Sequence, residues 1–289
     1  MRNGLKKLVA AVAVSMMATT AVAEITFGVL APRGALKASE QWSALADYIS
    51  ERTGQTVTFA AEEADQAFAN FSNGDYDLFL TNPVQAANLQ SQGASLLASL
   101  VKKSGKQFAG VIVANANSGI SSAADLKGKK VISLSKNAAG GFMFQAVHVT
   151  QAGLSVPGDF ALHKEGENQD DLVKLVERGV FDAAFVRTGV LEAMEKNGTV
   201  DMNNLIIVDE ASTDGFALRH STVLYPEWYM VGAASLDPEI AAVVSEALLA
   251  LEASAPAADA ANISGFVAPI DISPMIEALR LLRVSPFDS

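Results

Sequence analysis

The chain has 289 residues, half of them hydrophobic, which is enough to bury one large core or two smaller ones. It carries 32 Asp and Glu against 21 Lys and Arg, a formal net charge of −11, and this argues against nucleic acid as a partner because proteins that bind nucleic acid present basic patches. The lack of cysteine excludes cysteine nucleophiles, thiolate metal sites, iron–sulfur clusters and disulfides.

Residues 1–23 have the features of a secretory signal peptide. Three basic residues open the segment, residues 8–17 form an apolar stretch too short to span a bilayer, and Ala-Val-Ala at 21–23 fits the small-x-small cleavage pattern. We therefore predict cleavage after Ala23 and export to the periplasm, with an uncleaved membrane anchor as the alternative. Loss of the three positive charges takes the net charge from −11 to −14.

Short apolar runs then alternate with amphipathic segments, which predicts alternating strands and helices. The strands predicted first are Ile25–Leu30, Val57–Ala60, Asp77–Leu80 and Leu96–Leu100, and the helices are Ala35–Arg52, Ala64–Phe71 and Val84–Gln92. Trp42, Leu45 and Ile49 fall on one face of the first helix, and Gly54 follows it as a stop signal.

A second set of alternating elements begins with the apolar run Ala109–Ala114. Further strands are predicted at Val131–Leu134, Phe160–His163, Ala183–Val186 and Leu205–Val208, a helix-capping turn at Ser121–Leu126, and helices at Gly141–Gln151, Asp170–Arg178 and Val190–Lys196. Repeated strand–helix units predict mostly parallel sheets, which bind ligands at the carboxyl ends of their strands.

The last part of the chain returns to a strand at Ser221–Leu224 and then to helices at Pro238–Ala253 and Ser273–Leu282. Ala253–Ala261 is either a loop or an interruption of a helix. Two strand–helix sets without a long linker predict two lobes with a cleft between them.

The stretch Asp125–Phe144 joins an apolar strand to a run of small residues and a helix start. The run leaves the backbone N–H groups of residues 139–142 with little side-chain cover. A helix start carries about half a positive charge and outward-pointing donors, which suits an anion. An ordinary strand–turn–helix corner explains the same residues equally well. The candidate ligand residues of this turn are Asn137, Ala139, Gly140, Gly141 and Phe142.

Five segments occur in the order and at the distances found in a known family. They are GVLAPRG (28–34), DYDLFLTNPVQ (75–85), DLKGKKVISLSKNAAGGFMF (125–144), FDAAFVRTGVLEAM (181–194) and STVLYPEW (221–228). Together they resemble the phosphonate-binding-protein-like branch of the type II periplasmic substrate-binding proteins. More narrowly, they resemble the periplasmic domains of tetrathionate-type sensor histidine kinases. The resemblance covers nearly all of residues 25–251.

The resemblance implies an α/β fold of two mixed-sheet lobes joined by two crossover strands. Lobe 1 would comprise residues 24–109 and 221–289, and lobe 2 residues 110–220. In such a fold the two lobes close on a small ligand like a hinged trap.

The resemblance also implies which residues of lobe 2 hold the ligand. The small-residue turn matches the family's anion-holding turn, where many phosphonate binders carry hydroxyl side chains that this chain lacks. Arg187 and Thr188 follow the strand Ala183–Val186 at its carboxyl end. An arginine there offers paired donors to a carboxylate, sulfonate or phosphate. A surface ion pair of Arg187 with an acid such as Glu192 is the alternative.

Lobe 1 and the second crossover supply the remaining candidates. Arg33 follows the first strand, with a solvated arginine at a helix start as its alternative role. Thr81 and Asn82 end the third strand, with helix capping as theirs. Arg219 and Ser221 lie near the second crossover and are expected to line the floor of the cleft.

We predict a periplasmic solute-binding protein that traps a small oxyanion and presents it to a membrane sensor kinase. The ligand is phosphonate-like, a sulfur oxyanion or a small organic dianion. The alternative is a component that delivers such an anion to an ABC transporter permease. The mature form is expected to be a soluble monomer. Replacement of Arg187 by Ala is expected to abolish stabilisation by ligand and to leave the melting temperature of the ligand-free protein unchanged.

An enzyme is not predicted, because the chain has no GxSxG, HExxH or Walker A motif. His148, His163 and His220 are scattered without the spacing of metal ligands. We expect no metal site and no cofactor.

Overall fold

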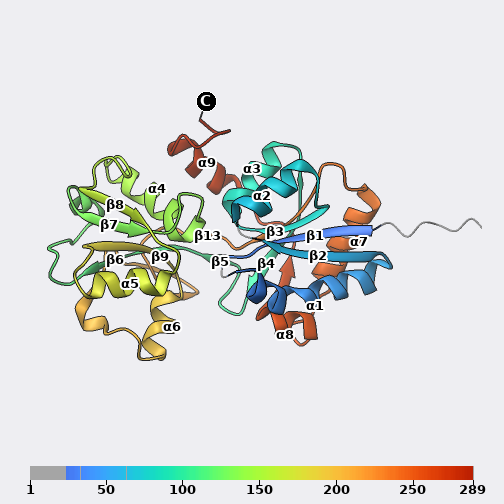
Figure 1. Cartoon of the computed structure of the whole chain (residues 1–289), viewed down its shortest axis with the longest axis horizontal. Helices are drawn as coiled ribbons and strands as arrows, with labels where there is room; N and C mark the ends of the chain where they lie inside the picture. The colour runs from blue at the N-terminus through green and yellow to red at the C-terminus, as the bar shows by residue number, and fades with distance from the viewer. Residues whose placement is uncertain (1–23, 33, 63, 289) are drawn as a thin grey trace, which may run out of the picture.

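Two β-sheets organise the chain, and helices cover both of them (Figure 1). The computed structural model describes residues 24–32, 34–62 and 64–288. In spatial order the six-stranded sheet contains β15 (Ile263–Val267), β4 (Ser95–Lys102), β14 (Tyr229–Gly232), β3 (Leu78–Thr81), β1 (Glu24–Leu30) and β2 (Thr56–Glu62). The five-stranded sheet contains β10 (Leu205–Ile207), β6 (Gly110–Asn115), β9 (Ala183–Arg187), β7 (Lys130–Ser133) and β8 (Leu162–Glu165).

Each of the two sheets has its own set of helices beside it. Those beside the six-stranded sheet are α1 (Ala35–Thr53), α2 (Ala64–Asn73), α3 (Pro83–Ser91), α7 (Pro238–Leu249), α8 (Pro256–Ala261) and α9 (Ser273–Leu281). Those beside the five-stranded sheet are α4 (Phe144–Gln151), α5 (Gln169–Glu177) and α6 (Val190–Lys196), with the short helices η1 (Ala123–Leu126), η2 (Ala139–Met143) and η3 (Met202–Asn204).

Both large sheets mix parallel and antiparallel pairs. β1 pairs in parallel with β2 and β3, whereas β14 runs antiparallel to β3 and β4. β7 pairs in parallel with β8 and β9, whereas β6 runs antiparallel to β9. The predicted fold class, α/β with two mixed sheets, is confirmed.

Helix α1 illustrates how sequence periodicity places an element. Trp42, Leu45 and Ile49 are spaced three and four residues apart, so they lie on one face, and all three are buried against the six-stranded sheet. Gly54 takes the left-handed conformation (φ 67°) and donates its N–H to the carbonyl of Ser50, which ends the helix where the sequence predicts.

Two chain segments that lie side by side connect the sheets. One contains β5 (Gln107–Phe108) and the other β13 (Tyr225–Pro226), and the two strands pair in antiparallel register. The first segment leads from β4 of the six-stranded sheet to β6 of the five-stranded sheet. The second leads from β12 back to β14 of the six-stranded sheet. The predicted pair of crossover strands is therefore present.

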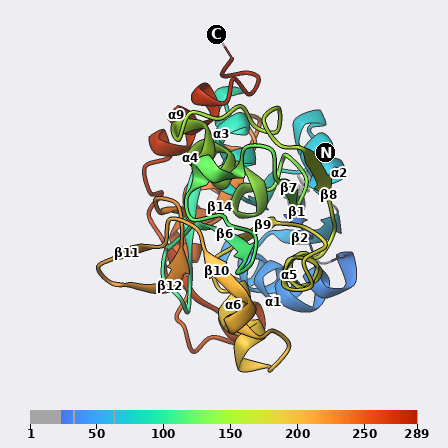
Figure 2. The same ribbon diagram turned by 90° about the vertical axis from the view of Figure 1, so that its left-hand side faces the viewer.

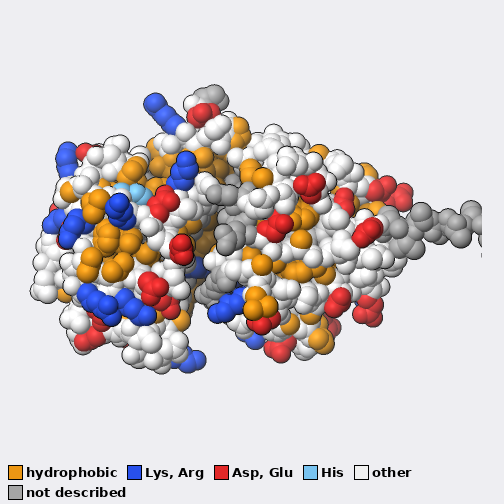
Figure 3. All heavy atoms as spheres, viewed as in Figure 1, with side chains coloured by type: hydrophobic (Ala, Val, Ile, Leu, Met, Phe, Trp, Pro, Cys, Tyr) orange, Lys and Arg blue, Asp and Glu red, His pale blue; other side chains and the backbone are white. Residues whose placement is uncertain are grey.

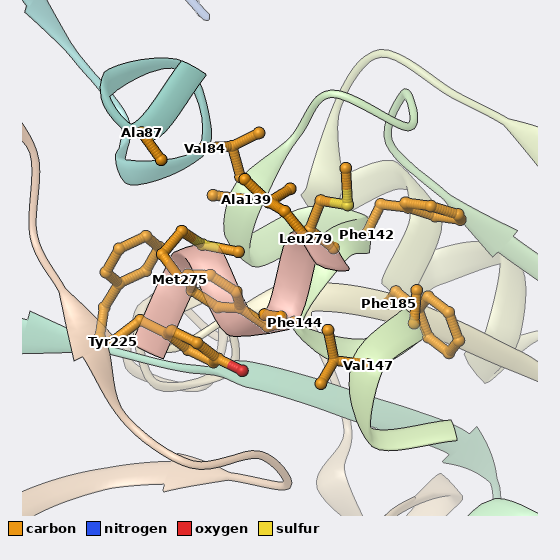
Figure 4. Close-up of a cluster of buried hydrophobic side chains, with 14 of the residues drawn as sticks. Val84, Ala87, Ala139, Phe142, Phe144, Val147, Phe185, Tyr225, Met275 and Leu279 are labelled. Atoms are coloured by element: carbon orange, nitrogen blue, oxygen red, sulfur yellow. The ribbon is translucent and has the colours of Figure 1, made fainter. Parts of the chain in front are cut away.

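An apolar cluster also spans the two parts (Figure 4). Tyr225 stacks on Phe144 of α4 with ring centroids 4.0 Å apart. Met275 and Leu279 of α9 lie in the same cluster as Val84 of α3. The C-terminal helix therefore packs at the junction and buries apolar surface from both parts.

The segment 221–224 is not the strand that the sequence predicts. Its backbone bends at Ser221 and Thr222. The hydroxyls of these two residues accept the N–H groups of Ile112 and Gly110 of β6, and their own N–H groups both donate to the carbonyl of Gly110. Strand β12 (Phe216–His220) ends just before it and pairs with β11 (Ala211–Thr213) in a hairpin that projects from the body (Figure 2).

Two other predictions need correction, and one strand is missing from the predicted elements. The strand predicted at 160–163 lies two residues later as β8, because Phe160 packs its ring against Phe185 instead of entering the ladder. The segment 253–261 ends in helix α8, which starts at Pro256. Strand β15 follows α8 and was not predicted. Among the described residues, no helix is long and apolar enough to cross a bilayer.

Candidate functional site

The small-residue turn after β7 forms the start of a π-helical turn, η2, which runs directly into α4. Its N-cap is Ala138, and no side chain caps it within the described part of the chain. The first N–H groups of a helix have no acceptor inside the helix. Those of residues 139–142 belong to residues that are buried in this structure. An anion-binding role for this turn therefore stays a prediction.

The glycines of this turn are required by its neighbours. A Cβ atom on Gly140 would lie 2.8 Å from the ring of Phe108 and 2.9 Å from Cβ of Arg187. A Cβ on Gly141 would lie 2.8 Å from the side chain of Leu134. These distances are too short for real contacts, so only glycine allows the turn to lie against the end of β9. The turn and Arg187 are therefore in direct contact.

Arg187 ends β9 and points its guanidinium toward the connection between the sheets. The group lies 4.5 Å from the ring centroid of Phe108, and its Nη2 donates to Oε1 of Glu227 at 2.9 Å. About a quarter of the side chain is exposed. Because a guanidinium has five donors in a planar fork, one carboxylate contact leaves other donors for a ligand.

The alternative pairing of Arg187 with Glu192 is wrong. Oε1 of Glu192 instead accepts the backbone N–H of Arg219 at 2.7 Å. The true partner, Glu227, comes directly after β13 and has no exposed surface. Its other oxygen, Oε2, lies 3.5 Å from Nζ of Lys102 at the end of β4.

Sequence reasoning missed Glu227 and Lys102. The only signal for Glu227 is a charged residue inside an apolar aromatic segment, between Pro226 and Trp228. Lys102 lies in an ordinary Lys-Lys pair at a strand end, and nothing local distinguishes it from Lys103.

Gln145 of α4 is a third residue that sequence reasoning missed. It is fully buried, and its Nε2 donates to the carbonyls of Gly140 and Val186 at 2.8 and 2.7 Å. The carbonyl of Gly140 belongs to the turn, and that of Val186 belongs to the residue directly before Arg187. One amide therefore fixes the turn against the strand that carries the arginine.

Thr81 and Asn82 lie at the carboxyl end of β3, and both are buried. Oδ1 of Asn82 accepts the N–H groups of Val84 and Gln85 at 2.9 and 3.1 Å and so caps α3. The hydroxyl of Thr81 donates to Oε1 of Gln85. The described contacts of Thr81 and Asn82 are thus those of helix capping, which was the alternative to ligand binding. Both residues lie on the side of the junction that belongs to the six-stranded sheet.

Thr188 and Ser221 bond the backbone of β6 and of Ala109, the residue that directly precedes β6. The Thr188 hydroxyl accepts the N–H of Ala109 at 3.3 Å, and that of Ser221 accepts the N–H of Ile112 at 2.9 Å. Both hydroxyls therefore fix the connecting segments to the five-stranded sheet.

Arg219 lies apart from the turn. Its Nη1 donates to Oε2 of Glu195 on α6 at 2.8 Å, and this hydrogen bond raises the pKa of the guanidinium. Asn137 lies two residues before the turn, and Arg33 lies outside the described residues.

Of the predicted site residues, the structure brings together the turn 139–142 and Arg187. They meet Phe108, Glu227 and Lys102 where the two sheets are connected. Figure 3 shows the surface hollowed between the two parts of the molecule. In the described part of the chain, no group of three or more His, Asp and Glu side chains is arranged to hold a metal ion.

A family model described as the periplasmic substrate-binding protein of phosphonate ABC transporters matches residues 27–271. The tetrathionate sensor histidine kinase TtrS of Salmonella typhimurium is 30% identical over 266 residues, which make up 90% of this chain and 44% of TtrS. The chain thus spans less than half the length of this curated relative.

Two solved structures have the same fold. PhnD1 from Prochlorococcus marinus, in complex with methylphosphonate, matches with a TM-score of 0.70 and 18% identity over 90% of this chain and 98% of that one. A binding protein component of an ABC phosphonate transporter from Pseudomonas aeruginosa matches with a TM-score of 0.68 and 15% identity over 90% and 88% of the two chains. At these identities the likeness concerns the fold alone.

Proposed function

The chain belongs to the family of phosphonate ABC transporter periplasmic substrate-binding proteins, and from that premise we propose that it traps a small oxyanion between two lobes. We propose that lobe 1 comprises residues 24–109 and 221–289, and lobe 2 residues 110–220. The division of the strands supports these bounds, since each large sheet draws all its strands from one lobe. The ligand is phosphonate-like, a sulfur oxyanion or a small organic dianion.

The contact between Arg187 and the turn 139–142 carries this proposal. It combines the N–H donors of a helix start with a partly exposed guanidinium. Arg187 and Lys102 together carry two positive charges against the single negative charge of Glu227, which leaves the cluster net positive. An oxyanion between the turn and Arg187 accepts hydrogen bonds from both.

The other predicted residues complete the proposed site. Asn137 and Thr188 flank the turn and Arg187 in sequence, while Thr81, Asn82 and Arg33 follow predicted strands of lobe 1 in sequence and are the proposed ligand residues of that lobe. Ligand contacts from both lobes favour the closed form, because a ligand shifts the equilibrium toward the state that it binds better. Ser221 and Arg219 are left out of the proposed ligand contacts, because their described bonds go to Ile112 of β6 and to Glu195 of α6.

We propose a membrane sensor kinase as the partner that reads the closed form. The likeness to TtrS extends over 90% of this chain, and TtrS is described as a sensor histidine kinase. Delivery of the anion to an ABC transporter permease is the second candidate, favoured by the family model. In either role the protein works as a monomer without catalysis, cofactor or nucleic acid, in the periplasm after cleavage behind Ala23.

A thermal-shift screen of phosphonates, thiosulfate, tetrathionate, sulfonates and dicarboxylates tests the proposal. A ligand at one hundred times its Kd stabilises the protein by about 2.7 kcal/mol, so at least one anion should raise the melting temperature clearly. Arg187→Lys keeps a charge for Glu227 but removes the planar fork, so we expect it to weaken this shift. Arg219→Lys is the matched control and should retain the shift. A protein that none of these anions stabilises, or a full shift in Arg187→Lys, would contradict the proposal.

A further inference from the structure

We propose that Arg187 and Lys102 neutralise the buried carboxylate of Glu227 and that the site therefore rejects ligands that carry an ammonium group next to the anionic one. This inference rests on the proposed function and specifies its ligand class: anions without a positive charge of their own. Glu227 acts through Arg187 and is a positioning residue.

The three charged groups come from three separate elements. Lys102 ends β4 of the six-stranded sheet, Arg187 ends β9 of the five-stranded sheet, and Glu227 follows β13 in the connection between them. Oε1 of Glu227 accepts from Nη2 of Arg187 at 2.9 Å, and Oε2 lies 3.5 Å from Nζ of Lys102. Each carboxylate oxygen thus has its own cation.

Burial keeps the carboxylate out of the reach of a ligand, and its Oε2 accepts no hydrogen bond from the described residues. The Glu227 side chain has no exposed surface, whereas those of Arg187 and Lys102 are 24% and 27% exposed. A ligand can therefore reach the cations but not the carboxylate. An isolated buried carboxylate is strongly unfavourable, so the two cations offset the cost of burying Glu227.

The groups that this charged cluster and the turn present to a ligand are hydrogen-bond donors. The guanidinium of Arg187 has donors only, and the turn offers the N–H groups of residues 139–142. An ammonium group also has donors only and carries the same charge as Arg187. To bind next to the anion it would have to displace Lys102 or Arg187 from Glu227, and the carboxylate would have to become exposed.

Lys102 and Lys103 provide a matched pair of variants. Lys102→Met removes the cation from Oε2 of Glu227 and leaves that oxygen able to accept an ammonium group. Lys103→Met makes the same change at the next residue, where the lysine is 56% exposed and lies 3.9 Å from Asp259. Only the first substitution should change the preference between ligands.

The experiment measures the affinity for pairs of probes that differ by one ammonium group: ethylphosphonate and 2-aminoethylphosphonate, ethanesulfonate and 2-aminoethanesulfonate, propanoate and 3-aminopropanoate. We expect the wild type and Lys103→Met to bind the member without an amine at least tenfold more tightly in any pair that binds. We expect Lys102→Met to reduce this ratio to threefold or less.

Two results would overturn the inference and leave the proposed function standing. One is equal or tighter binding of the amine-bearing probes by the wild type. The other is an unchanged ratio in Lys102→Met. Failure of every anion in the pairs and in the wider screen would instead overturn the proposed function and the inference with it.

A measurement without ligand tests the neutralisation itself. The unfolding free energies of Lys102→Met, Glu227→Gln and the double variant form a cycle that isolates the interaction between the two side chains. We expect the effects to be non-additive, because Lys102 loses its role once Glu227 is uncharged. Strictly additive effects would mean that Lys102 does not neutralise Glu227, whichever ligands bind.

Discussion

Two arginines, Arg187 and Arg219, each form one short ion pair, yet their surroundings differ. The distances are 2.9 Å to Glu227 and 2.8 Å to Glu195. Glu227 is fully buried at the junction of the two sheets, whereas 48% of the Glu195 side chain on α6 is exposed. The distance between two charged groups therefore does not by itself determine how much their ion pair contributes to stability. Burial decides what the loss of one partner costs, because a buried charge cannot regain its hydration.

The largest expected effect comes from breaking each pair in turn. Arg187→Ala leaves Glu227 buried with Lys102 as its remaining cation and should lower the free energy of unfolding by about 3 kcal/mol. Arg219→Ala should cost about 1 kcal/mol or less. Urea unfolding of both variants checks the difference. The sequence alone leads one to expect no change in the ligand-free Arg187→Ala protein, and the buried partner reverses that expectation. Equal costs in the two variants would contradict it.

The amide of Gln145 allows a second comparison, with the amide of Asn115. Gln145→Leu removes the donor shared by the carbonyls of Gly140 and Val186 and should cost about 2 kcal/mol, since both carbonyls are left without it. Asn115→Leu removes a similar amide that bonds the carbonyls of residues 176 and 177, away from the turn.

The readout that separates these two variants is anion binding, measured by titration calorimetry. Gln145→Leu should weaken it, because the turn is no longer fixed against Arg187, whereas Asn115→Leu should leave it unchanged. Equal affinities in the two variants would show that Gln145 contributes to stability alone.

The close approach of the turn to Arg187 can be tested at Gly140. Gly140→Ala forces a Cβ to within 2.8 Å of Phe108 and 2.9 Å of Arg187, which should cost about 1–3 kcal/mol and displace the guanidinium. Gly198→Ala is the control, because its Cβ meets nothing within 4 Å and only its backbone (φ 65°) is strained. Both variants should be less stable, but only Gly140→Ala should lose affinity for the anion. Retained affinity in Gly140→Ala would contradict the contact.

The smallest effect is a pH dependence from His163, which lies against Phe142 of the turn and bonds the Ser133 hydroxyl at 2.9 Å. Burial lowers the pKa of His163 below its usual value of 6.5. Between the folded pKa and about 6.5 the unfolded state binds more protons, so the contribution of this group is full above about 6.5 and declines as the pH falls. Melting temperatures from pH 7.5 to 5.5 should fall less in His163→Gln than in the wild type. Parallel curves would contradict this.

The predicted fold holds where local patterns carry it. The α1 face with Trp42, Leu45 and Ile49 and the strands β1, β3 and β9 lie within a few residues of their predicted bounds. The prediction is wrong at 221–224, where Ser221 and Thr222 use their side chains to bond β6. A local pattern within that segment cannot predict a hydrogen bond to residues more than 100 positions away in the sequence.

The candidate site divides in the same way. The turn 139–142 and Arg187 could be proposed from the sequence, because small residues after a strand and an arginine at a strand end are local signals. Glu227, Lys102 and Gln145 were missed, because their roles depend on partners that the fold brings from other elements.

The sequence by itself determined the alternation of strands and helices, the family and the type of donor at the turn, because these follow from spacing and composition over short stretches. Only the tertiary structure decided which charge meets which. Arg187 finds its carboxylate 40 residues away, and that carboxylate is buried because three elements converge on it. Ion pairing and burial depend on distances in space, which the order of residues along a chain does not contain.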